Sequence, residues 1–283
     1  MCCLFGFIDY AGALSVRQKN RLIRELSIAA EARGTDAAGI AYNTSRGLQI
    51  YKRPLAAYRL HLRIPAEAHV IMGHTRMATQ GSAKKNYNNH PFFGYVKGKR
   101  FALAHNGVLW NDRGLRHTKH LPKTKIQTDS YVAVQLLEQQ KVLDFDSLAK
   151  MAEQVEGSFS FAVLDEQDAL WIVKGDSPLS IAYFPECGVY VYASTAEILN
   201  RALTRYGRQL GCRKTIEVEM GKLLKIDRRG HITRATFDAS KLCRPSWEYW
   251  GSSLYAEPPK MESEHIRLLK SVARAFGFTG EMI

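Results

Sequence analysis

Two groups of strand-like segments, separated by a pair of helical segments, constrain the fold of this 283-residue chain more than any other feature. Phe159, Phe161 and Val163 alternate with small residues, which is the two-residue period of a strand. Strands are expected over 4–9, 39–43, 48–52, 70–75, 101–105, 158–164, 170–173, 180–184, 189–193, 215–220, 223–227 and 232–236. Helices are expected over 17–33, 129–140, 144–155 and 195–204. Because these elements come in groups and not as a βαβ repeat, they predict an α+β fold, an αββα sandwich of two antiparallel sheets with outer helices.

The composition excludes several classes of protein. Apolar residues make up 46% of the chain, as in a globular domain, and no apolar run approaches the roughly 18 residues of a membrane span. No signal peptide is recognisable, so the chain is expected to be cytoplasmic, with no membrane partner. Five scattered cysteines without a C-x-x-C pair argue against a disulfide framework and against a zinc site. We therefore expect neither a metal nor a cofactor.

Basic residues are concentrated in the stretch 97–125. The chain has a formal net charge of +13, and this stretch holds eight basic residues and one acidic residue. Such a concentration favours a polyanionic partner, a nucleotide or a nucleic acid, through steering and counterion release. The alternative is an ordinary solvated basic face.

The chain opens Met-Cys-Cys-Leu-Phe-Gly, so removal of Met1 would make Cys2 the first residue. A terminal cysteine can supply its own general base, because a free α-amino group titrates near ~7.7 to 8 and can take the thiol proton. Nucleophile and base would then lie on one residue. Position alone does not establish this role, since a cysteine near a terminus is commonly inert.

Several further motifs follow Cys2 along the chain. They are Arg33-Gly34-Thr35-Asp36-Ala37-Ala38-Gly39, Gly73-His74-Thr75-Arg76-Met77-Ala78-Thr79-Gln80-Gly81, Asn88-Asn89-His90-Pro91-Phe92, His105-Asn106-Gly107 and Thr128-Asp129. With the M-C-x-x-F-G start, their order resembles that of class II glutamine amidotransferases, the N-terminal-nucleophile family that includes the glutaminase domain of glucosamine-6-phosphate synthase. The resemblance covers about residues 2–237 and implies an Ntn-hydrolase-like αββα fold.

The resemblance implies a role for each matched residue. Cys2 would attack the glutamine side-chain amide and form a thioester, and the side chain of Asn106 with the backbone N–H of Gly107 would form the oxyanion hole. Arg76 would grip the α-carboxylate and Asp129 the α-ammonium group, with Thr79 also in the substrate site. The residues expected to support the loop around Cys2 are Arg33, Gly34 and Asp36.

Taken singly, the same residues have ordinary explanations. Arg76 alone would be a surface ion-pair residue, Asn106-Gly107 a hairpin turn, and Asp129 a favourable charge at a helix start. The histidines His74, His90 and His105 are expected to be hydrogen-bonded structural residues, because the mechanism needs no histidine base.

Three positions depart from the family pattern. Cys3 stands where the family usually has glycine, so its side chain must fit beside the nucleophile, and its thiol could compete with that of Cys2. Met77 replaces an aromatic residue that helps gate an ammonia channel in the synthases, and Gln80 replaces a frequent histidine. These changes leave hydrolysis intact as an expectation and put channel gating in doubt.

The sequence thus predicts two parts, an amidotransferase domain over 1–237 and a C-terminal extension over 238–283 with an aromatic-rich segment and an amphipathic helix. The predicted function is a stand-alone glutaminase that takes L-glutamine and supplies ammonia to a separate acceptor-activating synthase subunit. Two alternatives remain open. One is a hydrolase of γ-glutamyl amides on larger metabolites, and the other is an inactive amidotransferase fold that serves as a binding or scaffold module.

Overall fold

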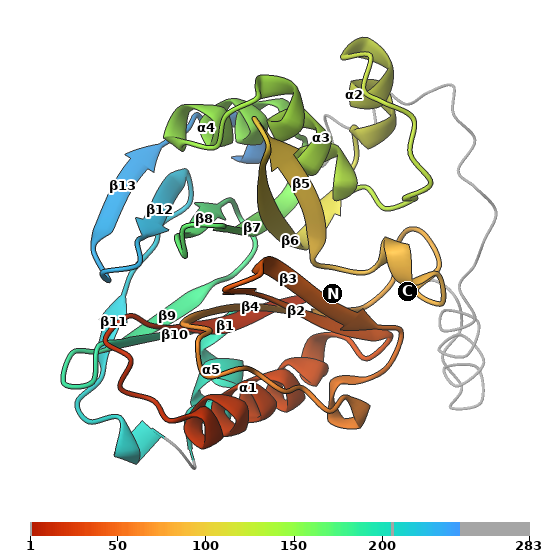
Figure 1. Ribbon diagram of the computed structural model, residues 1–283. Coiled ribbons are helices and arrows are strands. Elements are labelled where there is room, and N and C mark those ends of the chain that lie inside the picture. Colours follow the sequence, from red (N-terminus) through yellow and green to blue (C-terminus); the bar gives the residue numbers. More distant parts are fainter. Residues whose placement is uncertain (1, 205–206, 244–283) are drawn as a thin grey trace, which may run out of the picture. The chain divides into compact units, whose positions relative to one another are not determined.

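Two antiparallel sheets lie face to face, with helices on their outer faces (Figure 1). The computed structural model describes residues 2–204 and 207–243. The first sheet has the order β11-β9-β10-β1-β4-β2-β3 and the second the order β13-β12-β8-β7-β6-β5. Helices α1 (Val16–Ala30) and α5 (Ala196–Leu203) cover the first sheet, and α3 (Tyr131–Gln140) and α4 (Phe145–Gln154) cover the second. The predicted α+β sandwich of two antiparallel sheets is confirmed.

The strands of the first sheet are β1 (Cys3–Asp9), β2 (Ala37–Thr44), β3 (Gly47–Arg53), β4 (Val70–Arg76), β9 (Ser180–Phe184), β10 (Val189–Ala193) and β11 (Lys214–Ile216). Those of the second sheet are β5 (Phe92–Val96), β6 (Lys99–Leu109), β7 (Gly157–Asp165), β8 (Leu170–Lys174), β12 (Lys222–Ile226) and β13 (Ile232–Thr236). A short helix α2 (Asp112–Thr118) and 3₁₀ turns at Glu31–Arg33, Ala57–Arg59, Asn86–Asn88, Gly207–Gln209 and Ser240–Cys243 complete the described elements.

Local sequence signals set the helix boundaries. Ser15 and Gln18 form a capping box at the start of α1, in which the Ser15 side chain accepts from the Gln18 N–H and the Gln18 side chain accepts from the Ser15 N–H. Thr195 caps α5 in the same way through its hydroxyl, which accepts from Ile198 N–H. These caps satisfy N–H groups that have no partner within the helix, so α1 and α5 each begin at a defined residue.

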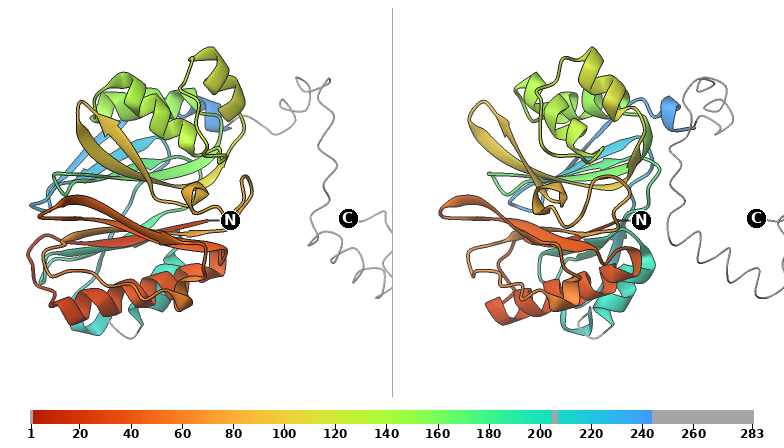
Figure 2. Two further views of the ribbon diagram at one scale, coloured as in Figure 1. Left: turned by 45° about the vertical axis from the view of Figure 1, so that its right-hand side comes forward. Right: turned by 90° about the vertical axis from the view of Figure 1, so that its right-hand side faces the viewer.

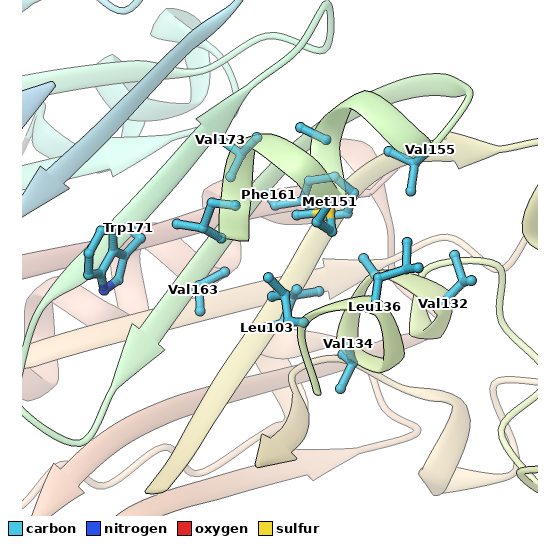
Figure 3. Packing of buried hydrophobic residues seen from close by; sticks show 14 of the residues in the cluster. Leu103, Val132, Val134, Leu136, Met151, Val155, Phe161, Val163, Trp171 and Val173 are labelled. Carbon is cyan, nitrogen blue, oxygen red and sulfur yellow. The ribbon is translucent and has the colours of Figure 1, made fainter. Parts of the chain in front are cut away.

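Strand alternation separates the protein interior into distinct apolar layers. Along β7, Phe159, Phe161 and Val163 pack under α3 and α4, while Ala162 and Leu164 pack against the first sheet. Figure 3 shows the layer beneath the helices, where side chains of β6, β7 and β8 meet those of α3 and α4. Both faces of the second sheet are buried, and its central strands therefore contain few polar residues.

The structure differs from the predicted elements in several places. β5 and α2 were not predicted, and the strand expected over 215–220 is limited to Lys214–Ile216. α3 begins at Tyr131, so Asp129 precedes the helix, and its carbonyl accepts from Val132 N–H over 3.1 Å. β5 lies at a sheet edge and contains Gly94, and α2 has seven residues, so both give short, weak periodic signals.

The two-sheet unit includes residues up to Cys243. Phe237 packs into the layer beneath α3 and α4, and the N–H of Asp238 donates to Glu153 Oε1 over 3.0 Å. The predicted division at residue 237 stays a prediction, and the helix expected in the C-terminal extension lies outside the described residues. None of the described helices combines the length and the apolar character that crossing a membrane requires.

Candidate active site

Cys2 lies directly before β1, a strand in the interior of the first sheet. β1 pairs with β10 on one side and with β4 on the other, with Cys3 opposite Thr75. This pairing places Cys2 beside Arg76, the last residue of β4, and the thiol donates to Met77 O over 3.5 Å. The start of β1 lies at one end of the two stacked sheets (Figure 2). A nucleophile here is carried by a well-fixed strand.

Arg33 joins the backbone of Cys2 to the second sheet. Its Nε donates to the carbonyl oxygen of Cys2 over 2.8 Å, and its Nη2 donates to Asn106 Oδ1 over 3.3 Å. Arg33 ends the 3₁₀ turn that follows α1, whereas Asn106 lies on β6. One guanidinium therefore fixes the relative positions of Cys2 and Asn106 across the two sheets.

The side-chain amide of Asn106 is held by its oxygen alone. Asn106 is 1% exposed, and its Nδ2 has no hydrogen-bond partner in the described part of the chain. Gly107 follows with φ +140°, and a Cβ at this position would overlap the carbonyl oxygen of Ser158 on β7. Only glycine fits this conformation at this spacing. The pair thus presents an unpaired amide donor next to a glycine backbone.

Gly34 and Asp36 attach the segment after Arg33 to the end of β4. A Cβ on Gly34 would lie 2.5 Å from Met77 N, so this close approach of two backbones requires glycine. The N–H of Asp36 donates to Arg76 O over 3.0 Å, and the carboxylate of Asp36 accepts from Ala78 N–H over 2.7 Å. These contacts fix the loop that contains Met77, whose carbonyl oxygen accepts the hydrogen bond from the Cys2 thiol.

Arg76 is 3% exposed and partly committed within the protein. Nη1 donates to Asn89 Oδ1 over 2.7 Å, and Nη2 donates to the carbonyls of Gln80 and Gly81. These three bonds use three of the five N–H groups of a guanidinium. Within the described residues, two N–H groups remain for a carboxylate ligand.

Asp129 lies before α3 and is 4% exposed. Its Oδ2 accepts from Leu109 N–H over 2.7 Å and its Oδ1 from the hydroxyl of Ser130 over 3.3 Å. Thr79, also expected in the substrate site, lies exposed on the loop after β4. Asp129 thus joins the end of β6, next to Asn106-Gly107, to the start of α3.

Charge interactions connect Cys2, Arg76 and Asp129. Burial raises the pKa of the Cys2 thiol, the hydrogen bond to Met77 and the charge of Arg76 oppose this rise, and Asp129 adds to it. Burial likewise lowers the pKa of Arg76, while Cys2, Asp129 and Asp36 act in the opposite direction. The structure therefore brings the predicted nucleophile and both predicted amino-acid-binding residues into one neighbourhood.

A family model described as "Glutamine amidotransferase domain" matches residues 74–201. The glutamine–fructose-6-phosphate aminotransferase (isomerizing) of Staphylococcus epidermidis is 30% identical over 251 residues, which is 84% of this chain and 39% of the relative. Its counterpart in Halalkalibacterium halodurans is 34% identical over 206 residues, 69% of this chain and 32% of the relative. The chain belongs to the class II glutamine amidotransferases. It spans 32% to 39% of the length of these enzymes.

Solved structures support the same fold for this amidotransferase. The glutamine phosphoribosylpyrophosphate amidotransferase of B. subtilis, in complex with ADP and GMP, aligns with a TM-score of 0.64 at 21% identity. A structure described as the allosteric regulatory enzyme of purine biosynthesis aligns with a TM-score of 0.66, also at 21% identity. Each alignment covers 84% of this chain and 49% of the solved chain. At this identity the likeness concerns the fold alone.

Cys3 faces away from Cys2 in the amidotransferase. Its side chain is fully buried in the layer between β1 and α1, and burial raises the pKa of its thiol to about 11. Successive residues entering a strand point to opposite faces, which explains how a second cysteine fits beside the first. A thiol that is buried and protonated is a poor competitor for substrate.

The expectation that all three motif histidines are hydrogen-bonded is wrong for His90. His74 Nε2 pairs with His105 O over 2.9 Å, and His105 Nδ1 pairs with Ser130 Oγ over 2.8 Å. Both ring nitrogens of His90 are buried without a partner among the described residues, and the ring packs between His74 and Phe92. Burial lowers the pKa of all three, that of His74 to about 3, so each ring is neutral near pH 7.

The basic stretch 97–125 is divided in space. Lys97, Lys99 and Arg100 lie at the hairpin between β5 and β6, and Arg100 is paired with Glu166 over 2.8 Å. The other five basic residues lie on α2 and the loop after it, beyond the opposite end of β6. A single continuous patch over the whole stretch is therefore not formed. Within the described residues, no group of three or more His, Cys, Asp or Glu side chains could hold a metal ion.

Asn88, Asn89 and Lys52 contact the site but received no role from the sequence. The two asparagines belong to a motif used for the resemblance, and they bond to Gln127 and Arg76 respectively. Lys52 on β3 donates to the carbonyls of Asn89 and Pro91. The motif marked the position of these residues, but only the fold shows which partner each side chain reaches.

Proposed function

We propose that this chain hydrolyses the side-chain amide of L-glutamine, with Cys2 as the nucleophile once Met1 has been removed, and passes on the ammonia. The proposal is supported by family membership and by the site geometry. Cys2, Arg76 and Asp129 interact electrostatically, and Asn106 is joined to the Cys2 backbone through Arg33.

One observation carries the proposal, namely the unpaired Nδ2 of Asn106. A buried donor without a partner destabilises a folded protein by about 1–3 kcal/mol, so such groups are few in native structures and each needs an explanation. Arg33 holds Oδ1, which leaves Nδ2 as the free end of the amide. A donor that is fixed before the reaction and unpaired in the free enzyme is what a developing oxyanion requires.

The proposed reaction proceeds in two acyl transfers. The α-amino group of Cys2 takes the thiol proton, and Sγ bonds to the amide carbon of glutamine, whose oxygen becomes an oxyanion held by Asn106 and Gly107. The C–N bond then breaks, and the nitrogen takes the proton from the α-ammonium group and leaves as ammonia. Water next attacks the thioester, which releases glutamate and restores the thiol. No hydrogen bond joins Cys2 to His74, His90 or His105, in keeping with a base on Cys2 itself.

Arg76 and Asp129 would hold the amino-acid end of the substrate. The free N–H groups of Arg76 suit the α-carboxylate, and the Asp129 carboxylate suits the α-ammonium group. Met77, half exposed and adjacent to Arg76, would lie at the rim of the pocket. Glutamine would thereby be oriented with its side chain toward Cys2.

Ammonia release from glutamine by the purified protein tests this proposal. Intact-mass measurement should show loss of Met1, and a glutamine-analogue electrophile should add once, at Cys2. Cys2→Ala should abolish ammonia release while leaving thermal unfolding unchanged, and Cys3→Ala should retain release. Retained Met1 together with no ammonia release would support an inactive binding module, and faster release from bulkier γ-glutamyl amides would support the hydrolase alternative.

The destination of the ammonia is a further part of the proposal. The relatives named above are aminotransferases, and the proposed counterpart here is a separate acceptor-activating synthase subunit. Co-purification from the native host, followed by an assay in which glutamine-dependent product formation is compared with that from added ammonia, tests this part. With glutamine as the nitrogen source, product formation should require this chain. With added ammonia, the synthase subunit should form the product without it.

The basic residues near α2 support a proposed anionic ligand, a nucleotide or a nucleic acid. Arg113, Lys119, Lys123 and Lys125 are exposed there, next to the loop that leads to Asp129. Binding of nucleotides and of duplex DNA at low salt, weakening as salt is raised, is expected. Binding that is absent at low salt would refute this part.

The cytoplasmic location of the protein stays a prediction.

A further inference from the structure

Two adjacent asparagines lie between the segments that carry Arg76 and Asp129. Asn88 ends the 3₁₀ turn Asn86–Asn88, Asn89 follows it, and both are fully buried. Buried amides are retained in a fold when their donors and acceptors have partners, and here each side chain joins segments that are distant in sequence.

Asn89 fixes the guanidinium of Arg76. Its Oδ1 accepts from Arg76 Nη1 over 2.7 Å, and its Nδ2 donates to Ala83 O over 2.8 Å and to Asn86 Oδ1 over 3.3 Å. Arg76 Nη2 is held separately by the carbonyls after β4. Because hydrogen bonds hold both terminal nitrogens of Arg76, the plane of its guanidinium group is fixed.

Asn88 fixes the approach to Asp129. Its Oδ1 accepts from Gln127 N–H over 2.9 Å, and its Nδ2 donates to Ser82 O over 3.1 Å and to Gln127 Oε1 over 3.3 Å. Gln127 stands two residues before Asp129. Asn88 therefore ties the segment that leads to Asp129 to the same loop that holds Arg76.

Lys52 holds the backbone on which both asparagines stand. Its Nζ donates to Asn89 O over 2.5 Å and to Pro91 O over 2.8 Å, and it lies 4.9 Å from the centre of the Phe92 ring. These bonds come from β3, an edge strand of the first sheet. The asparagine pair is thus tied to a regular element.

We propose that Asn88 and Asn89 are positioning residues that set the spacing between the two ends of the glutamine-binding clamp, Asn89 for the α-carboxylate and Asn88 for the α-ammonium group. This inference rests on the proposed glutaminase function. Because the asparagines act on the clamp and not on Cys2, they affect the binding of glutamine more than the chemical step.

Steady-state kinetics with three amides test the inference. The probes are L-glutamine, glutaramate, which lacks the α-amino group, and 4-aminobutanamide, which lacks the α-carboxylate. For Asn89→Ala we expect KM for glutamine to rise about 10-fold with kcat within about twofold, since the lost bond is to a charged group. Its preference for glutamine over 4-aminobutanamide should fall, whereas its preference over glutaramate should persist. Asn88→Ala should show the opposite pattern.

Two further variants sharpen the experiment. Asn89→Asp keeps an oxygen that accepts from Arg76 but loses the donor to Ala83 O and adds a negative charge beside the carboxylate site, so it should not restore KM. Asn43→Ala is the matched control, because Asn43 is a buried asparagine whose amide bridges two segments elsewhere, and it should leave both preferences unchanged. If Asn89→Ala does not fold, Asn89→Ser takes its place with the same expected rise in KM.

The outcomes separate the inference from the function on which it rests. Wild-type protein that releases no ammonia contradicts the proposed function. Glutamine affinity, measured by calorimetry with Cys2→Ala protein and the same asparagine changes, then still tests the clamp. Unchanged affinity or KM in both Asn88→Ala and Asn89→Ala, or a fall in kcat alone, overturns the inference.

Discussion

Arg33 Nη2 donates to Asn106 Oδ1 over 3.3 Å, and this bond determines which end of the Asn106 amide stays unpaired. Without it the amide could rotate and present its oxygen, which would repel an oxyanion. The same guanidinium also donates to the carbonyl of Cys2. One side chain therefore positions both the proposed nucleophile and the amide donor of Asn106.

Replacement of Arg33 should therefore impair catalysis more than substrate binding. For Arg33→Met we expect kcat to fall at least about 10-fold, as one tenfold step corresponds to ~1.4 kcal/mol of lost transition-state stabilisation, with a small change in KM. Arg33→Lys should not restore kcat, because an ammonium lacks the planar fork that reaches both partners. Ammonia release measured over a range of glutamine concentrations gives both constants. A pure rise in KM would contradict this account.

Asn106→Ala should separate activity from stability. Removing one oxyanion donor typically lowers kcat by about 100- to 1,000-fold. The same change also removes a buried donor that has no partner, so the lost bond to Arg33 is offset and the unfolding temperature should stay close to that of the wild type. Kinetics and thermal unfolding on one preparation check both parts. A large loss of stability would show that Nδ2 has a structural role.

The reactivity of Cys2 should respond to its charged neighbours with opposite signs. Asp129 raises and Arg76 lowers the pKa of the thiol. In Asp129→Asn protein, alkylation by the neutral reagent iodoacetamide should therefore reach its half-maximal rate at lower pH than in the wild type, and in Arg76→Met protein at higher pH. Peptide mass spectrometry distinguishes Cys2 from Cys3, which should stay unmodified below its pKa of about 11. Shifts in the same direction for both variants would be inconsistent with this geometry.

Lys52 should make stability depend on pH in the alkaline range. Burial lowers its pKa from 10.5 to about 8, so between these values the unfolded chain binds the proton and the folded chain does not. The unfolding free energy contributed by this group therefore rises as pH increases from about 8 to about 10.5. Relative to wild type, Lys52→Met should lose that rise. Urea unfolding at pH 7.5, 9 and 10.5 measures it, and parallel curves for the two proteins would exclude the effect.

Gly34→Ala should damage the site through the backbone. The added methyl group would meet Arg76 and the N–H of Met77 where the two chain segments touch. We expect a lower unfolding temperature and weaker glutamine binding, because the end of β4 must move. Gly114→Ala is the control, since the space around Gly114 on α2 is open. Equal effects at the two positions would argue against the close packing at Gly34.

The sequence predicted most of this fold because its strands and helices carry strong periodic patterns. The alternation of Phe159, Phe161 and Val163 predicted β7, and all three side chains pack on the face that α3 and α4 cover. The helix expected over 195–204 is found as α5, which Thr195 caps. The failures have physical reasons. Among the described residues His90 has no polar partner, because its ring packs between His74 and Phe92, and ring packing leaves no periodic signal.

The candidate site was predicted less completely than the fold. The order of the motifs predicted Cys2, Arg76, Asn106 and Asp129 as site residues. The contacts among them depend on loops, and the path of a loop leaves no periodic pattern in the sequence. Asn88 and Asn89 belong to one of the motifs, but the motif predicted no role for either side chain. Which carbonyl or amide each one reaches follows from the packing of β3, β4 and the start of α3, and that packing exists only in three dimensions.

The position of β1 between β4 and β10 bears on when the site can form during synthesis. The N–H of Leu4 donates to the hydroxyl of Ser194 across 190 positions, and Phe5 pairs with Ala193. A ribosome adds about 5–20 residues per second, so the Cys2 end waits on the order of ten seconds or more for its later neighbour. During that interval the nascent chain carries the thiol without the strand that completes its sheet. Assembly of the reaction centre is thereby postponed until most of the two-sheet unit has left the ribosome.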